Sequence, residues 1–473
     1  MDNFTKIKET DARFDVSLII LSVEKPEKSA LKSIGSSFFN NMILTFFKLI
    51  TTTNLILLGH LLYEQKVHYQ LFMTFQIGVF ILEFLGKYFI IGLLKYIFGD
   101  RKDTKSLYEI YIRMKTTFIF LIPLIIIPFS ICSYYIIDLI YEFALEIGNK
   151  SLIGEVYKRF LIFTPIIYFF EILFLLNLNF LYVLNKIRMV FMCIVCYLIC
   201  HITLSWMLLY ILNFGLFGLT ISYCFNSLIY FFFTNRFIYN KVKEDANDYF
   251  YLIPNKNNFD FEIINSLKRI GFYSLINLGD IFPTQFLFLV SLFIGKNQLI
   301  VNIIYLNFFE LLTEINRGFY YTIKKDIFLK FQDTLERQKN IIFFSIYFSI
   351  IILSIFIILL LFKNILLNIY IYNGGEPIFQ KIAENLKIIY PLCIISMSAK
   401  LILNGIIRGM ELPVSNKRRF VYMIICIFFC YIFCFLYDFG IIGLWISLLI
   451  LEILHVVENF AKTIKYFPFS HAG

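Results

Sequence analysis

The chain alternates long apolar stretches with short polar ones, and this alternation constrains its fold more than any other feature. The apolar stretches reach about 20 residues, the length at which a helix crosses the hydrocarbon core of a bilayer. A soluble protein cannot bury this much apolar surface, since 59% of the residues are hydrophobic and the mean hydropathy is +0.76. No stretch shows the strict alternation of a membrane barrel, so we expect helices. The twelve expected spans are 34–58, 70–97, 117–141, 160–184, 187–212, 216–240, 267–294, 299–322, 341–362, 384–408, 420–437 and 440–465.

A glycine motif occurs twice, each time in the short connection between two apolar stretches. Asn213–Ser222 and Asp438–Ser447 share the pattern x-F-G-x-x-G-L-x-I-S at an offset of 225 residues, the difference between 438 and 213. Two glycines three positions apart allow a tight turn and close packing of the helix that follows. These motif glycines are Gly215, Gly218, Gly440 and Gly443.

Two further matches indicate that the whole chain is a repeat. Leu31–Gly35 and Leu267–Gly271 share L-K-x-I-G and open the first and seventh stretches, and Pro165 and Pro391 lie near the start of the fourth and tenth. We therefore expect two homologous halves, each a bundle of six helices. The expected parts are an arm (1–32), an N-terminal bundle (33–240), a linker (241–262), a C-terminal bundle (263–467) and a tail (468–473).

Lys and Arg gather in the arm, the linker and the other loops on the same side, whereas the two glycine-motif loops hold none. By the positive-inside rule, both termini are expected in the cytoplasm. The net charge of +10 follows from this loading of cytoplasmic loops and does not indicate nucleic acid. The nine cysteines show no metal-ligand spacing, so no metal or cofactor is expected.

The C-terminal half resembles the multidrug and toxic compound extrusion (MATE) transporters. Gly405, Arg408 and Gly409 form a segment similar to the family's G-x-L-R-G at the end of helix ten. Gly440–Ile446 is similar to its G-x-x-G-x-W-I at the start of helix twelve. Leu306–Phe308, the distance from Asp280 to Gly295, and Asn213–Ser222 also fit the family pattern.

The resemblance implies two bundles that rock around a central cavity and export a small molecule against a Na⁺ or H⁺ gradient. It implies an amphipathic or cationic organic substrate, a transported ion rather than a bound cofactor, and a monomer that is not an enzyme. Flippases for lipid-linked oligosaccharides or polysaccharides share the superfamily and stay open as an alternative. A membrane-embedded transferase is a remoter alternative, because the exoplasmic loops are short and poor in acidic residues and His.

Two charged residues in the expected spans are the candidates for ion coupling. Charges persist at the centre of a spanning helix only with partners or in a wet cavity, because they cost about 2.5–3.5 kcal/mol there. Asp280 lies near the middle of the seventh stretch, three residues before Pro283. Many relatives carry a second acid in helix ten, where this chain has Met397, and Lys400 follows three residues later. We predict that Lys400 pairs with Asp280 in one state of the transport cycle, although a simple neutralising role is an equal alternative.

Helix eight presents Asn307, Glu310, Glu314 and Arg317 on one face, because their spacings are three, four and three. We predict that Asn307, Glu310, Glu314 and, from helix ten, Asn404 line the substrate cavity. For Glu310 a place in an internal Glu–Arg cluster is an equal alternative, and for Glu314 the favoured alternative is a structural pair with Arg317.

The N-terminal half offers fewer candidates. Glu171 in the fourth stretch is expected to pair with Lys48, and His201 in the fifth is expected to be a hydrogen-bonded packing residue. The same packing role is expected for His455 with Glu452 and Glu458 in the twelfth stretch.

Overall fold

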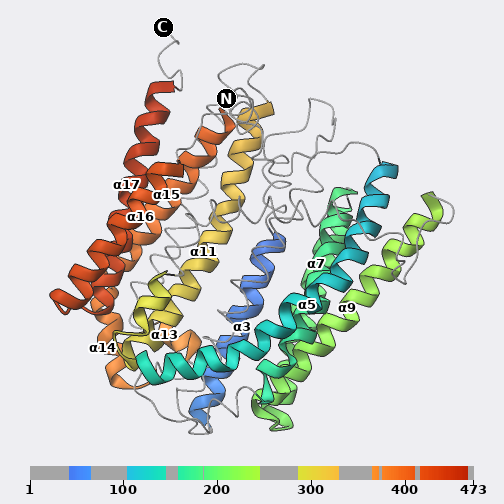
Figure 1. Ribbon diagram of the computed structural model, residues 1–473, viewed down its shortest axis with the longest axis horizontal. Helices are drawn as coiled ribbons and strands as arrows, with labels where there is room; N and C mark the ends of the chain where they lie inside the picture. Colours follow the sequence, from blue (N-terminus) through green and yellow to red (C-terminus); the bar gives the residue numbers. More distant parts are fainter. Residues whose placement is uncertain are drawn as a thin grey trace. The chain divides into compact units, whose positions relative to one another are not determined.

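The computed structural model describes residues 42–64, 104–144, 158–184, 186–245, 286–329, 365–371, 375–410 and 416–466. Within these ranges the chain is helical, as the apolar stretches predict (Figure 1). The elements are α3 (Met42–Glu64), α5 (Thr104–Ala144), the 3₁₀ turn η2 (Leu161–Phe163), α7 (Thr164–Val183), α8 (Ile187–Trp206), the π-helical turn η3 (Met207–Ile211), α9 (Gly215–Asp245), α11 (Lys296–Leu329), α13 (Ile365–Tyr370), α14 (Pro377–Leu386), α15 (Ile389–Gly409), α16 (Asn416–Cys430), the π-helical turn η6 (Tyr431–Leu436) and α17 (Ile441–Tyr466).

Seven helices of the described ranges are long and apolar enough to cross a membrane. They lie in α5, α7, α8 with η3, α9, α11, α15 and α17, and shorter apolar segments lie in α3 and in α16 with η6. These helices match the first, third to sixth, eighth and tenth to twelfth expected spans. The second and ninth spans, and most of the seventh, lie outside the described residues.

The chain forms two compact units. The N-terminal unit contains α5, α7, α8, α9 and the part of α3 from Thr53 onward. The C-terminal unit contains α11 to α17 and the part of α3 up to Thr52. The bundle boundaries expected from the sequence stay a prediction.

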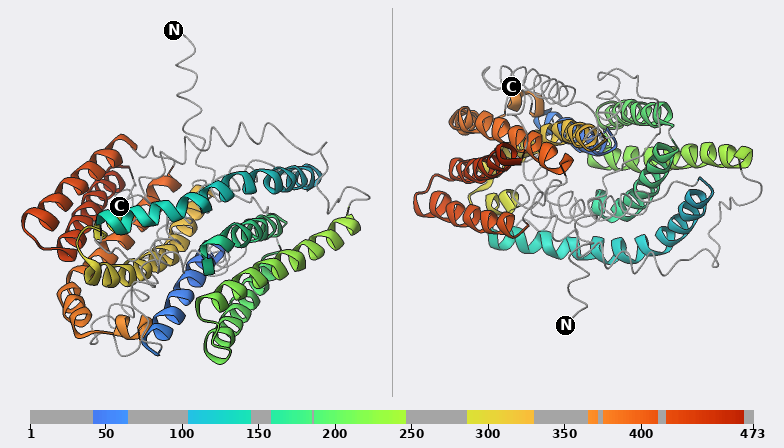
Figure 2. Two further views of the ribbon diagram at one scale, coloured as in Figure 1. Left: turned by 60° about the horizontal axis from the view of Figure 1, so that its bottom comes forward. Right: turned by 90° about the horizontal axis from the view of Figure 1, so that it is seen from above.

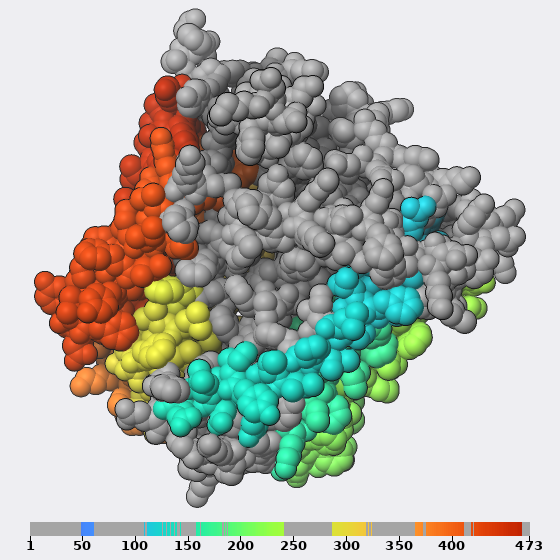
Figure 3. Space-filling model, in the orientation of Figure 1, coloured from blue at the N-terminus to red at the C-terminus, as the bar shows by residue number. Residues whose placement is uncertain are grey.

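The core of the N-terminal unit forms around α7. This helix packs against α5, α8 and α9 and is buried on nearly all sides, with Ile172 to Leu176 almost fully enclosed. Outward-facing positions are apolar instead: Leu124, Ile131, Tyr135 and Leu139 are exposed along α5, which lies open on the face seen in Figure 3. An exposed apolar surface beside a packed core is the pattern of helices surrounded by lipid. Pro123 and Pro128 lie inside α5, and the helix bends along its length (Figure 2).

The core of the C-terminal unit forms around α15, which packs against α11 and α17. Trp445 of α17 is fully buried and meets the rings of Tyr390 and Phe309 edge to face, with centroid distances of 4.8 and 5.6 Å. Its indole N–H donates to Asn302 Oδ1 at 3.1 Å. Gly405 allows α15 to approach α11, because a Cβ there would lie 3.0 Å from the carbonyl oxygen of Tyr320.

The glycine motif has the same backbone in both units. Asn213 and Asp438 have φ of 54° and 53°, and Gly215 and Gly440 have φ of 55° and 53°. These left-handed conformations suit Asn, Asp and Gly. Each motif follows a π-helical turn, η3 or η6, which closes with equivalent backbone hydrogen bonds, Leu212 N–H to Met207 O in one unit and Tyr437 N–H to Ile432 O in the other.

The second glycine of each motif touches the end of the preceding helix. A Cβ at Gly218 would lie 3.0 Å from Leu208, and one at Gly443 would lie 2.7 Å from Phe433. Leu208 and Phe433 are again 225 residues apart. The sequence repeat is therefore a repeat of structure at this connection.

Candidate functional site

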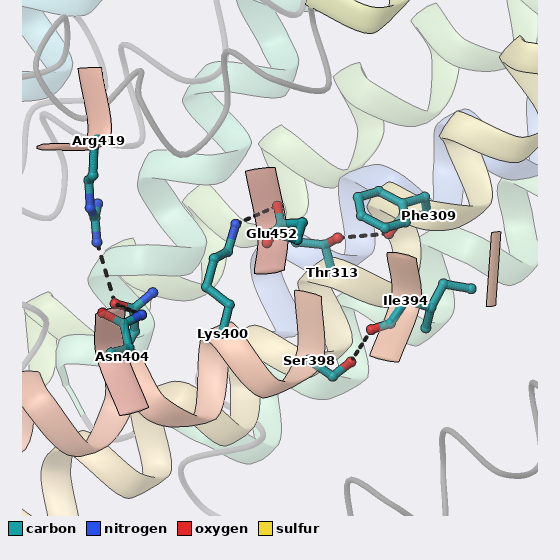
Figure 4. A network of polar contacts seen from close by, with 9 residues as sticks. Phe309, Thr313, Ile394, Ser398, Lys400, Asn404, Arg419 and Glu452 are labelled. Carbon is teal, nitrogen blue, oxygen red and sulfur yellow. Dashed lines mark hydrogen bonds and ion pairs between the residues drawn. The ribbon is translucent and has the colours of Figure 1, made fainter. Parts of the chain in front are cut away.

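A buried ion pair lies within the C-terminal unit. Lys400 Nζ of α15 is 2.7 Å from Glu452 Oε1 of α17, and the two residues are 7% and 3% exposed. Figure 4 shows the two side chains reaching toward each other from their helices. Each residue lies eleven positions after the start of its helix, so both stand at the same depth. At 1.5 Å per residue this depth is about 16 Å from the helix start, near the middle of a bilayer.

The other oxygen of this carboxylate, Glu452 Oε2, is buried and has no hydrogen-bond partner among the described residues. Leaving a buried acceptor without a hydrogen bond costs about 1–3 kcal/mol, and more when the acceptor is charged. The second oxygen can take up a proton or accept a hydrogen bond from a second donor.

The internal repeat provides a comparison for this pair. At the proline offset of helices four and ten, Phe174 corresponds to Lys400, and at the motif offset Ser227 corresponds to Glu452. Phe174 and Ser227 are both fully buried, and neither is charged. The same helix packing therefore forms without an ion pair in the N-terminal unit. Buried pairs contribute little net stability, so the need for charge at Lys400 and Glu452 lies outside folding.

A second polar cluster lies toward the end of α15. Asn404 Oδ1 accepts hydrogen bonds from Asn459 Nδ2 of α17 at 3.1 Å and from Arg419 Nη2 of α16 at 3.5 Å, so it joins three helices (Figure 4). Arg408 lies half-buried in the last turn of α15, and Gly409 ends the helix.

The polar face of α11 is divided between two environments. Asn307 is buried, and its Oδ1 accepts hydrogen bonds from Thr52 at 2.8 Å and from Tyr370 at 2.7 Å. One turn further along, Glu310 is half-buried. Glu314 accepts a hydrogen bond from Arg317 at 2.5 Å, which is the structural pair favoured for these residues.

The structure thus brings some of the predicted residues into contact with partners and leaves others untested. Asp280 lies outside the described residues, so its pairing with Lys400 stays a prediction for another state. The partner that Lys400 has here, Glu452, was expected only to pack with His455. The equal depth of the two residues became visible only with the helix starts of the structure, because the expected spans place Lys400 and Glu452 at different distances from their starts.

No protein-family model matches this sequence, and no curated protein matches it. Solved structures do match the fold of the chain. The eukaryotic MATE transporter AtDTX14 matches with a TM-score of 0.65 at 16% identity, over 92% of this chain and 95% of that one. A multidrug resistance MATE family transporter of the MOP superfamily, in its inward-facing conformation, matches with a TM-score of 0.59 at 14% identity, over 93% and 98%.

A third match is a MOP superfamily transporter from Pyrococcus furiosus, with a TM-score of 0.60 at 16% identity over 93% and 96% of the two chains. Together with the apolar helices, these matches define a multi-pass, all-α integral membrane protein. More specifically, the chain shares the fold of these solved structures, which are described as MATE transporters or as a MOP superfamily transporter.

Proposed function

We propose that this chain is a secondary active transporter that works by alternating access. The observation that carries the proposal is the fold, which is shared over more than nine-tenths of the chain with MATE transporters solved in both inward-facing and outward-facing conformations. A two-unit fold with an internal repeat fits a mechanism in which each unit moves as a body. The proposed orientation puts both termini in the cytoplasm, because the basic residues gather on that side.

We propose that the Lys400–Glu452 pair takes part in ion coupling. In the conformation described here the ammonium of Lys400 is held by Glu452. In the alternate conformation Lys400 is released to Asp280, and Glu452 is neutralised by a proton. An exchange of partners of this kind links the conformation of the unit to the ion gradient, because each partner stabilises one conformation.

The proposed substrate is an amphipathic or cationic organic compound, exported in exchange for H⁺ or Na⁺ by a monomeric transporter. Two transporters that share the fold are described as multidrug resistance transporters, which supports an organic substrate. The reversed polarity of the binding pocket in the Pyrococcus furiosus protein suggests a different function for that protein. The fold therefore does not determine the charge of the substrate, and a lipid-linked oligosaccharide or polysaccharide is the second candidate.

Substrate uptake into proteoliposomes under an imposed pH or Na⁺ gradient tests the proposal. The wild type is compared with Asp280→Asn and Glu452→Gln, and with Glu384→Gln as a control at an exposed position of α14. We expect gradient-driven flux of an organic cation in the wild type and the control, and its loss in the two other variants. Flux that is equal in all four proteins would contradict the coupling roles. If no gradient moves any organic cation, the exporter proposal is wrong, and flipping of a lipid-linked substrate is measured next.

A further inference from the structure

The N-terminal unit contains a buried carboxylate that the proposed coupling site does not use. Glu171 of α7 is 1% exposed, and its Oε1 accepts a hydrogen bond from the hydroxyl of Tyr223 of α9 at 3.0 Å. The residue lies seven positions after the start of α7, inside a candidate membrane span. An ionisable side chain at such a place indicates function.

A histidine lies directly beside the tyrosine that binds this carboxylate. The rings of His201 and Tyr223 are 5.2 Å apart between centroids, and His201 is fully buried on α8. His201 Nε2 is 2.7 Å from Asn54 Oδ1, which can only accept, so this nitrogen is assigned the proton. His201 Nδ1 then accepts from Ser222 or Asn226, each at 3.4 Å.

Further hydrogen bonds between hydroxyl groups join α8 to α9 near His201. Ser222 accepts from Ser205 at 2.7 Å, and Tyr197 and Ser227 share a hydrogen bond of 3.1 Å. The Glu171–Tyr223 hydrogen bond and the hydrogen bonds of His201 are therefore two separate groups, which meet where the rings of Tyr223 and His201 contact each other. Chains of carboxylate, histidine and hydroxyl groups are the parts from which proton relays in membranes are built.

Other titratable groups face α7 from the neighbouring helices of the unit. Lys115 of α5 donates to Asn235 and lies 5.8 Å from the centroid of the Tyr111 ring. The side chain of Lys48, the partner expected for Glu171, lies outside the described residues. Among the described residues, further titratable side chains on α8 and α9 are Cys193, Tyr197, Cys224 and Tyr230.

The corresponding positions of the C-terminal unit show whether the fold requires Glu171 and Tyr223. Met397 corresponds to Glu171 at the proline offset, and Leu448 corresponds to Tyr223 at the motif offset. Both are buried and apolar, so the C-terminal unit forms the same helix packing without a carboxylate or a phenol there. The polar pair of the N-terminal unit is not required by the fold.

We propose that Glu171 is a proton-binding site in the N-terminal unit, with Tyr223 as the hydrogen-bond donor to its ionised form and His201 as a positioning residue for Tyr223. The proton comes from water on one side of the membrane and forms an O–H bond with the Glu171 carboxylate. It later leaves as H⁺ to water on the other side, which restores the ionised carboxylate. A proton fits better than Na⁺, because the phenol of Tyr223 donates a hydrogen bond to the carboxylate, whereas a hard cation requires several oxygen acceptors. The role as a second coupling site rests on the proposed transport function, whereas proton binding does not.

Infrared difference spectroscopy of the full-length protein in lipid tests proton binding without requiring transport. As the pH is lowered, we expect the carbonyl band of a buried protonated carboxylic acid to appear in the wild type. In the Glu452→Gln background, which removes the contribution of that carboxylate, the band should be missing from Glu171→Gln and retained in Glu142→Gln, a control at an exposed carboxylate of α5. Absence of the band in the wild type, or its retention in a folded Glu171→Gln, would overturn the proposal.

Tyr223→Phe provides a second variant that keeps the carboxylate. Because the phenol stabilises the ionised carboxylate, its loss is expected to move the midpoint of the band to higher pH by about one unit or more. An unchanged midpoint would show that the phenol does not act on the protonating group, and would also overturn the proposal. His201→Gln is expected to move the midpoint in the same direction by a smaller amount, because it frees the Tyr223 ring.

The same proteins in proteoliposomes separate this inference from the proposed function. If the wild type shows the band but no gradient-driven flux, the proton site stands and the transport proposal is wrong. If Glu171→Gln transports as well under a pH gradient as the wild type, the transport proposal stands and the coupling role of Glu171 is wrong.

Discussion

The two units have the same backbone conformation at the glycine motif and differ in where they bury charged side chains. Around the glycine motif they agree in φ, in hydrogen bonds and in the contact of the second glycine. In the membrane interior, however, the C-terminal unit buries the Lys400–Glu452 ion pair, and the N-terminal unit buries Glu171 against the phenol of Tyr223, whose ring lies beside His201. Each unit is apolar or neutral at the positions where the other is charged. The comparison teaches that neither charge arrangement is needed to build a unit.

The largest effect is expected from removing the cation of the ion pair. Lys400→Met leaves Glu452 buried without a countercharge, at a cost of about 3–5 kcal/mol in the free energy of unfolding. The double variant Lys400→Met with Glu452→Gln removes both charges and should recover most of that stability, as the neutral pair of the other unit does, while gradient-driven transport stays lost. Thermal unfolding in detergent measures the stabilities.

Ser227→Ala is the matched change at the corresponding position of the N-terminal unit. It removes the hydrogen bond with Tyr197 and should cost only about 1 kcal/mol. If Lys400→Met and Ser227→Ala lowered the melting temperature equally, the proposed difference between the two cores would be wrong.

An intermediate effect is expected at the second motif glycine, where the two units have the same backbone conformation but different distances to the preceding helix. A Cβ at Gly443 would lie 2.7 Å from backbone carbon of Phe433, whereas at Gly218 the nearest atoms are 3.0 Å away, at Leu208. Gly443→Ala should therefore destabilise by about 1–3 kcal/mol, and Gly218→Ala by less. The melting temperatures of the two variants check the order, and a reversed order would show that the C-terminal connection is the more adaptable one.

The smallest effect is expected where charge is exposed. Arg418 is 60% exposed at its side chain and lies 3.2 Å from Glu458, which Lys462 also contacts at 2.7 Å. Arg418→Ala should change the free energy of unfolding by less than about 0.5 kcal/mol, because exposed pairs are screened by water. If Arg418→Ala lowered the free energy of unfolding as much as Lys400→Met, burial of the charge would not explain the difference expected between these two variants.

The sequence predicts the helical spans well, because an apolar run of bilayer length has few alternatives. The helices nevertheless extend beyond the apolar runs: the third span was expected at 117–141, and α5 begins at Thr104. The first turns of α5 are polar and lie outside the apolar run, so hydropathy does not predict that they are helical. The π-helical turns η3 and η6 were not predicted, because their residues are as apolar as the rest of the helices that they end.

The partners of the buried charges were harder to predict than the charges themselves. Lys400 was recognised as a candidate, and its contact with Glu452 was not, because the residues are 52 positions apart and no local spacing relates them. Glu314 with Arg317 was recognised, since i,i+3 spacing on a helix determines that contact. The network of Glu171, Tyr223 and His201 likewise depends on three helices that no periodicity connects.

The π-helical turns that end the fifth and eleventh helices also bear on how the internal repeat evolved. A π turn holds one residue more than the α-helical turn that it replaces, and turns of this kind are rare. η3 and η6 lie at matching positions of the two repeats, with matching hydrogen bonds. A shared insertion at one place is inherited more simply than acquired twice, so the ancestral half-length gene already encoded it before duplication. The buried charges differ between the repeats, so at each of those positions at least one repeat changed after that event: the shared connection has been kept, whereas the ionisable groups of the two units have diverged.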